Sequence, residues 1–241
     1  MTDNSNENNV NEDKVENKQV QTKNQENKPQ KEEKKSLKDE ILEWGFALLV
    51  AVFIALLIRY FIFTPTMVMQ TSMYPTLKEG ERLYLSRMIR NFDQMPERGD
   101  IITFEQPDAF PADGTVTAYY NKHEGVADNF VRYFLEIGKR SFIKRVIALP
   151  GEHIEIASGK VYINGEMLEE DYLVDGLETT NLDGEYYNLT VPEGYIFVMG
   201  DNRDGSQDSR AFGCIPFDKI EGKVLFRMWP LSEFGQIDKE E

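Results

Sequence analysis

Cysteine and histidine are scarce in this 241-residue chain, and their scarcity excludes several kinds of site. The single cysteine, Cys214, permits neither an internal disulfide nor a cysteine-cluster metal site. Only two histidines, His123 and His153, are present, so a multi-histidine metal site is not expected and a histidine triad would need one of them. We therefore expect no metal site and no cofactor.

Basic residues are also outnumbered, with 27 Lys and Arg against 42 Asp and Glu and a formal net charge of −15. A surface that binds nucleic-acid phosphates must be basic. The charge balance therefore argues against a nucleic-acid partner.

The first forty residues contain no aromatic residue. They hold eight Lys, ten Asp or Glu, eight Asn and four Gln, so 30 of 40 positions are charged or carry an amide. Such a segment cannot bury enough apolar surface to offset the entropy lost on ordering. We predict that residues 1–40 form a disordered tail.

A long apolar run follows the tail. Residues 44–58 carry no charge, and the whole segment 41–63 is long enough to span a bilayer core of about 30 Å. A buried helix of a soluble protein and a cleavable signal peptide are the alternatives. The forty-residue polar tail and the absence of an Ala-x-Ala site after the run disfavour the signal peptide. We predict an uncleaved transmembrane anchor.

Basic residues close to the anchor indicate its orientation. Four of them precede it, whereas those on the other side lie further out; the four are Lys31, Lys34, Lys35 and Lys38. The positive-inside rule places the tail in the cytoplasm. Residues 64–241 then form one domain outside the cytoplasm, and the protein is a single-pass protein of the cell membrane.

The remaining 178 residues have the texture of a β protein. Short apolar or alternating runs are bounded by Gly, Pro, Asn and Asp, which favours a sandwich or barrel. The stretch 158–168 predicts a hairpin with a type I′ turn at Asn164-Gly165, whereas "GVADNFVRYFLEIGK" (125–139) predicts a helix. Segments 106–140 and 152–195 are interpreted as insertions or peripheral hairpins.

Two serine-containing clusters could carry chemistry. Ser72 follows the anchor closely in "MQTSMYPTLKEG", and the second cluster is "GDNRDGSQDSR", residues 200–210. The second cluster has a solvated turn as its alternative. It does not match a calcium-binding EF-hand loop, because Gly200 and Ala211 would occupy positions that need carboxylates.

A possible base for the serine lies in "FIKRVIALPGE", residues 142–152. In a strand Lys144 and Arg145 would point to opposite faces, so one of them could point into the core. A buried lysine loses proton affinity and can then act as a general base, a role that arginine cannot fill. The alternative is an ordinary surface lysine.

The order of these motifs behind a membrane anchor resembles the type I signal peptidases. The matching residues are Ser72, Met73, Pro75, Thr76 and Leu77; Arg98 to Ile101; Lys144 to Ile147 with Leu149, Pro150 and Gly151; and Gly200 to Arg203 with Ser206, Asp208, Ser209 and Arg210. The resemblance implies a mostly β catalytic domain, of barrel or sandwich type, behind a single N-terminal transmembrane helix. The family form and the lone anchor suggest a bacterial enzyme of Gram-positive type.

By the resemblance, Ser72 is the nucleophile and Lys144 the general base of a Ser/Lys dyad. Ser206 would hydrogen-bond the lysine and orient it, Asp208 and Arg210 would form a supporting ion pair, and Arg145 would be an outward or bracing residue. Some family members add a hydroxyl to the oxyanion hole from a serine two residues before the nucleophile. This chain has Gln70 there, which leaves the second donor open.

The resemblance also implies the substrate. Signal peptides of secretory preproteins would bind by β-addition and be cut after small-x-small sites, with Val68, Met73 and Ile143 lining shallow apolar pockets. Core packing is the alternative role of these three side chains. Membrane lipid and the secretion translocon are further expected partners. A catalytically silent tethered binding protein and a related self-cleaving Ser/Lys peptidase are the competing functions.

Overall fold

The structure is a computed structural model that describes residues 36–61, 63–91, 94–109, 115–120, 140–180 and 186–237. The predicted helix at 125–139 and almost all of the predicted tail lie outside the described residues, as does most of segment 106–140.

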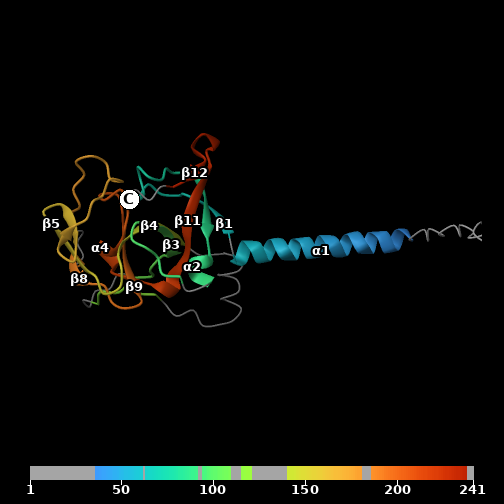
Figure 1. Cartoon of the computed structure of the whole chain (residues 1–241), viewed down its shortest axis with the longest axis horizontal. Helices are drawn as coiled ribbons and strands as arrows, with labels where there is room; N and C mark the ends of the chain where they lie inside the picture. Colours follow the sequence, from blue (N-terminus) through green and yellow to red (C-terminus); the bar gives the residue numbers. More distant parts are fainter. Residues whose placement is uncertain are drawn as a thin grey trace, which may run out of the picture. The chain divides into compact units, whose positions relative to one another are not determined.

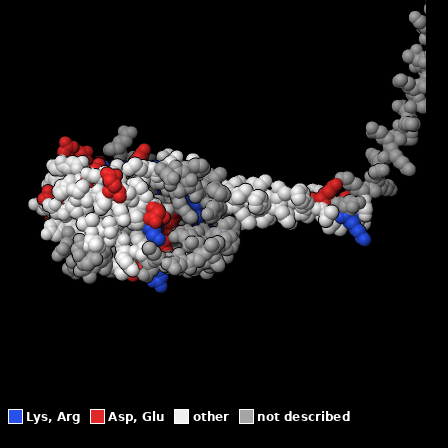
Figure 2. Space-filling view, turned by 90° about the horizontal axis from the view of Figure 1, so that it is seen from below, with Lys and Arg blue, Asp and Glu red and all other residues white. Residues whose placement is uncertain are grey.

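A single long helix, α1 (Leu37–Phe61), opens the described chain (Figure 1). Ser36 caps its first turn, because the Ser36 hydroxyl oxygen accepts a hydrogen bond from the backbone N–H of Lys38 at 3.3 Å. Residues 40–58 are long and apolar enough to cross a membrane, and their side chains are not buried in the protein. Figure 2 shows the corresponding white surface, beyond the charged residues of the first turns. The sequence places this segment at 41–63, but strand β1 already begins at Phe63.

The larger sheet of the β domain has eight antiparallel strands. Its strand order is β1-β2-β11-β3-β4-β9-β10, with β12 paired to β11. The strands are β1 (Phe63–Met67), β2 (Arg82–Ser86), β3 (Ile101–Glu105), β4 (Ser141–Ala148), β9 (Tyr195–Met199), β10 (Ile215–Pro216), β11 (Ile220–Trp229) and β12 (Gly235–Gln236). Short helical segments join them: α2 (Met88–Asn91), α4 (Ser209–Phe212), η2 (Phe217–Lys219) and η3 (Leu231–Glu233).

A second sheet has four strands in the order β7-β6-β5-β8. They are β5 (His153–Ala157), β6 (Lys160–Ile163), β7 (Glu166–Met167) and β8 (Asn188–Thr190), all within segment 152–195. Figure 1 shows β5 and β8 at the end of the domain opposite β1. The hairpin prediction is confirmed, because Ile163 pairs with Glu166 and both turn residues, Asn164 (φ 52°) and Gly165 (φ 86°), have positive φ.

Three apolar clusters form the core of the domain. One lies under the second sheet and includes Ile154 and Val161. Another is built on an aromatic trio, Phe104, Phe142 and Phe212, whose ring centroids are 6.1–6.2 Å apart. The third contains Val68, Met73, Leu77 and Leu83 and lies beside the loop that carries Ser72. The predicted fold class, mostly β behind one N-terminal apolar helix, is confirmed.

Candidate active site

Ser72 lies in the loop between β1 and β2, residues 68–81, here called the nucleophile loop. Two backbone hydrogen bonds close its base, from Val68 N to Glu81 O and from Gly80 N to Val68 O, both 2.9 Å long. Gly80 has φ +86°, a conformation that residues with a side chain rarely adopt. The side chains of Met73 and Leu77 are fully buried. The loop is thereby fixed at its ends and by its own apolar side chains.

Lys144 reaches this loop from the middle of β4. Its Nζ donates hydrogen bonds to Ser72 Oγ at 2.7 Å and to the carbonyl oxygen of Ile143 at 3.1 Å. The lysine is 1% exposed and the serine 7% exposed. The structure therefore brings together two residues that are 72 positions apart in the sequence and that share a buried hydrogen bond.

The environment of Lys144 favours the neutral amine. Burial lowers the pKa of Lys144 from 10.5 to about 8, although the nearby carboxylates of Asp208 and Asp201 act to raise it; the Arg210 guanidinium adds to the lowering. A substantial fraction of Lys144 is therefore unprotonated slightly above neutral pH. An unprotonated amine within hydrogen-bond distance of a hydroxyl can accept its proton.

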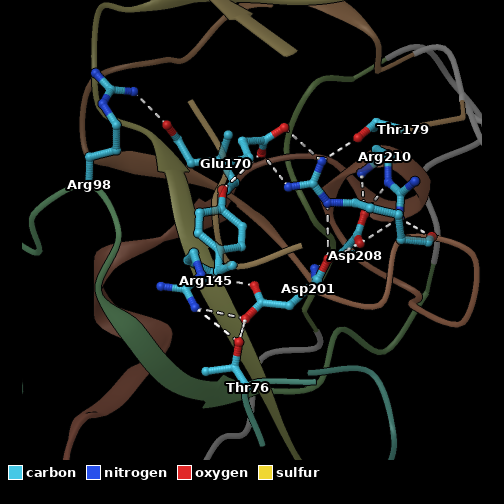
Figure 3. Close-up of polar contacts among 12 residues, drawn as sticks. Thr76, Arg98, Arg145, Glu170, Thr179, Asp201, Asp208 and Arg210 are labelled. Atoms are coloured by element: carbon cyan, nitrogen blue, oxygen red, sulfur yellow. Dashed lines mark hydrogen bonds and ion pairs between the residues drawn. The ribbon is translucent and has the colours of Figure 1, made fainter. Parts of the chain in front are cut away.

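Arg145 does not point outward, which corrects one of the two expectations for this residue. It is 3% exposed, and its Nε and Nη2 atoms donate to the two Asp201 oxygens at 2.9 and 2.7 Å (Figure 3). The Asp201 carboxylate also accepts a 2.6 Å hydrogen bond from Thr76 Oγ1. Arg145 is therefore buried, as Lys144 is. The Asp201 carboxylate makes this possible because it compensates the charge of Arg145. The bracing role is the one that the geometry fits.

Asp208 and Arg210 form the buried ion pair that the resemblance implies, with Arg210 Nη2 2.9 Å from Asp208 Oδ2. The same carboxylate accepts a hydrogen bond from Gly200 N at 3.0 Å and caps α4 through Arg210 N. The segment 200–210 is consequently packed into the site for the most part and is not a solvated turn, although Asp204, Gly205 and Gln207 are exposed.

Ser206 does not make the hydrogen bond to Lys144 that the resemblance implies. The Ser206 side chain is buried, yet its Oγ has no hydrogen-bond partner within the described part of the chain. Its position explains Gly200: a Cβ at residue 200 would overlap the Ser206 side chain and the carbonyl oxygen of Ser72. Ser206 therefore packs against the nucleophile loop by way of Gly200.

Two arginines, the buried Arg203 and the partly buried Arg227, escape the sequence-based interpretation of the site. Arg203 matches the family motif but receives no role there. Its guanidinium pairs with Glu170 and also donates to Thr179 Oγ1; these two partners are labelled in Figure 3. Arg227 on β11 donates to the Thr76 carbonyl oxygen at 2.7 Å and pairs with Glu81 at 2.8 Å. The only sequence signal for Arg227 is a charge within the apolar run of β11.

Ser72 lines a groove of about 400 Å³. Val68, Met73 and Ile143 line it beside the dyad, as does Gln70. Neither the Ser72 backbone N–H nor the Gln70 side chain has a hydrogen-bond partner among the described residues. Across those residues, no group of three or more His, Cys, Asp or Glu is placed to hold a metal ion.

Comparison with known proteins identifies the family. Residues 41–229 match the family model described as signal peptidase, peptidase S26. The chain belongs to the type I signal peptidases. A protein of Synechocystis sp. named "Probable signal peptidase I-1" is 38% identical over 79% of this chain and 83% of its own length. Signal peptidase I T of Bacillus subtilis is 34% identical over 84% of this chain and 92% of its own length.

A crystal structure of a signal peptidase I from Enterococcus faecalis V583 also matches, with a TM-score of 0.37 and 31% identity, over 54% of this chain and 97% of that chain. Membership in the family makes the present protein a serine peptidase, and thus a hydrolase. The sequence resemblance is thereby confirmed.

Proposed function

We propose that this enzyme is a membrane-bound endopeptidase that removes signal peptides from secretory preproteins, with Ser72 as nucleophile and Lys144 as general base. The observation that carries the mechanism is the 2.7 Å hydrogen bond between Lys144 Nζ and Ser72 Oγ. Burial of the amine supports it further, because it favours the unprotonated form that a base requires.

In the first half of the reaction, neutral Lys144 accepts the Ser72 proton while Ser72 Oγ bonds to the scissile carbonyl carbon. The ammonium then gives that proton to the leaving amine, the C–N bond breaks, and an ester links Ser72 to the signal peptide. In the second half, Lys144 takes a proton from a water molecule that attacks the ester. The carboxylate leaves, and the proton returns to Ser72 Oγ.

The oxyanion of the tetrahedral intermediate needs hydrogen-bond donors. The Ser72 backbone N–H is one, and the Gln70 side-chain amide is the second in our proposal. Both groups lie at the groove and lack hydrogen-bond partners within the described residues. The amide of Gln70 would thus take the place of the serine hydroxyl that some relatives use.

The groove suits an extended peptide. The outer edge of β1 is unpaired among the described strands, and β9 pairs with β4 only from Arg145 onward. A substrate strand can therefore hydrogen-bond along β1 and along residues 141–144. The apolar side chains of Val68, Met73 and Ile143 beside the dyad leave room for small residues at the first and third positions before the cut.

The enzyme would be anchored by α1, with residues 1–40 in the cytoplasm and residues 64–241 outside, as the lysines before the helix indicate. Large apolar side chains are exposed close to Ser72 in the sequence, namely Met67, Met69 and Tyr74, and at and after the end of β11, namely Trp229, Leu231 and Phe234. Lipid contact at Met67, Met69 and Tyr74 would bring the dyad to the level at which a signal peptide leaves the bilayer, beside the translocon.

Cleavage of a secretory precursor in detergent tests this function. We expect Ser72→Ala and Lys144→Ala to lose turnover while keeping the wild-type melting temperature within a few degrees. Lys160→Ala, at an exposed lysine of the second sheet, is the matched control and should retain full activity. Processing by Ser72→Ala at the wild-type rate would refute the mechanism. No processing by the folded wild type would favour a silent binding protein.

A further inference from the structure

The groove is lined by apolar residues in one part and by polar and charged residues in another. Beside Ser72 it is lined by the apolar Val68, Met73 and Ile143. Toward the start of β4, here called the outer end, the lining is polar and charged: Gln106, Arg140, Ser141 and Glu221. The family's small-residue pockets account for the apolar end, whereas the side chains at the outer end have no role in the proposed function.

Two side chains at the outer end are available to a ligand. The Arg140 guanidinium and the Gln106 amide make no hydrogen bond or ion pair with any residue that the structure describes. Their main chains are nevertheless fixed together, because Gln106 N donates to the Arg140 carbonyl oxygen at 2.9 Å. The position of Arg140 at the end of the groove is therefore set by the sheet.

No described residue forms an ion pair with Arg140. Glu221 lines the same end of the groove, but its carboxylate accepts a 2.9 Å hydrogen bond from Ser141 Oγ and has a further interaction, neither of them with Arg140. The chain as a whole carries a net charge of −15. Arg140, without a partner among the described residues, is thus a local exception on an acidic protein, at one end of the substrate groove.

The distance to the dyad identifies which substrate residues would reach the outer end. Arg140 precedes Ile143 by three residues, which is about 10 Å in an extended strand. A peptide paired with β4 advances by the same rise per residue. We place the first to third substrate residues before the cut beside Ile143. The fourth to sixth substrate residues, three positions further along the peptide, then lie beside Gln106 and Arg140.

We propose that Arg140, assisted by Gln106, is a specificity-determining residue that favours precursors with a carboxylate side chain at the fourth to sixth position before the cut. Arginine is the side chain best suited to a carboxylate, because its planar fork donates two parallel hydrogen bonds. The inference rests on the proposed function, since it assumes that a signal peptide occupies the groove.

The test is a set of precursors with Asp, Asn or Lys at each of these three positions, compared by kcat/KM. At one position or more we expect Asp to be cut about fivefold faster than Lys, with Asn between them, the size of an exposed ion pair. The ratio should shrink in high salt. Arg140→Glu should invert it, whereas Lys160→Glu, the same charge change on the second sheet, should leave it unaltered.

Each other outcome is informative. If the wild type cuts none of the precursors, the proposed function fails; if it cuts all of them equally, only the role of Arg140 is refuted. Arg140 could instead contact a lipid headgroup. In that case Arg140→Glu would weaken binding to phosphatidylglycerol vesicles and slow every precursor alike, with an unchanged ratio, and the inference would be overturned.

Discussion

The two sheets of the domain differ in the kind of residue that they bury. In the four-stranded sheet, apolar and polar residues alternate along β5 and β6. The apolar residues, such as Ile154 and Val161, form the buried face. In the eight-stranded sheet, β4 buries the consecutive basic residues Lys144 and Arg145, and four further charged residues are buried around them: Asp201, Arg203, Asp208 and Arg210.

This difference shows where stability and chemistry compete. Burying an apolar side chain stabilises a fold, whereas burying a charge destabilises it unless the charge is paired. Arg145, Arg203 and Arg210 each have a carboxylate partner, but Lys144 has a serine hydroxyl and a carbonyl oxygen instead. Lys144, the proposed base, is thus the one basic residue of these four without a carboxylate partner.

The largest expected effect is at Lys144. Lys144→Met removes the proposed base and should reduce kcat on the order of 10²–10⁴-fold. It should also raise the free energy of unfolding at pH 7, because below the folded pKa of about 8 the wild type must bury a charged amine.

The stability gain from Lys144→Met depends on pH. Between pH 8 and 10.5 the folded amine is neutral while the unfolded one is still protonated, so the wild type gains stability as pH rises and the gap closes. Denaturant unfolding at pH 7 and pH 10 measures the gap. A lower stability of Lys144→Met at pH 7 would contradict the burial of an unpaired amine.

Gly200→Ala should have the second-largest effect on kcat. The new methyl group would overlap Ser206 and the Ser72 carbonyl oxygen, so the nucleophile loop must shift. A displacement of about 1 Å at a catalytic group costs on the order of 10²-fold in rate. The measurement is kcat beside the melting temperature, with Gly165→Ala as control, since a Cβ at Gly165 meets no neighbouring atom although its positive φ strains the turn.

Arg227→Gln should have a smaller effect on the same loop. It removes the hydrogen bond to the Thr76 carbonyl oxygen and leaves Glu81 without its cation. We expect kcat to fall on the order of tenfold with KM nearly unchanged, and Arg227→Lys to restore part of the loss. An equal loss of stability in both variants without any change in kcat would make Arg227 purely structural.

The smallest effect is expected in the second sheet. Ile154→Val removes one buried methylene from an apolar cluster and should lower the free energy of unfolding by about 1 kcal/mol. Because neither Ser72 nor Lys144 belongs to this cluster, kcat per folded molecule should stay at the wild-type value. A reduced kcat would mean that the two sheets are more tightly coupled than we infer.

The difference between the two sheets also explains which features the sequence alone could predict. Alternation and an Asn-Gly turn are local signals, so the hairpin of β6 and β7 is predictable from its own residues. The apolar neighbours of Lys144 suggest burial, but only the family resemblance pairs it with Ser72. Arg203 and Arg227 bind carboxylates 33 and 146 residues away, and no local pattern contains that information.

The pH dependence of kcat/KM on a precursor peptide tests the central claim most directly, because it reports the ionisation of the free enzyme. If buried Lys144 is the base, kcat/KM rises from pH 6 with unit slope and levels off above an apparent pKa of about 8. A profile that is flat between pH 6 and 10, with Ser72 still required, would show that Lys144 is not the base.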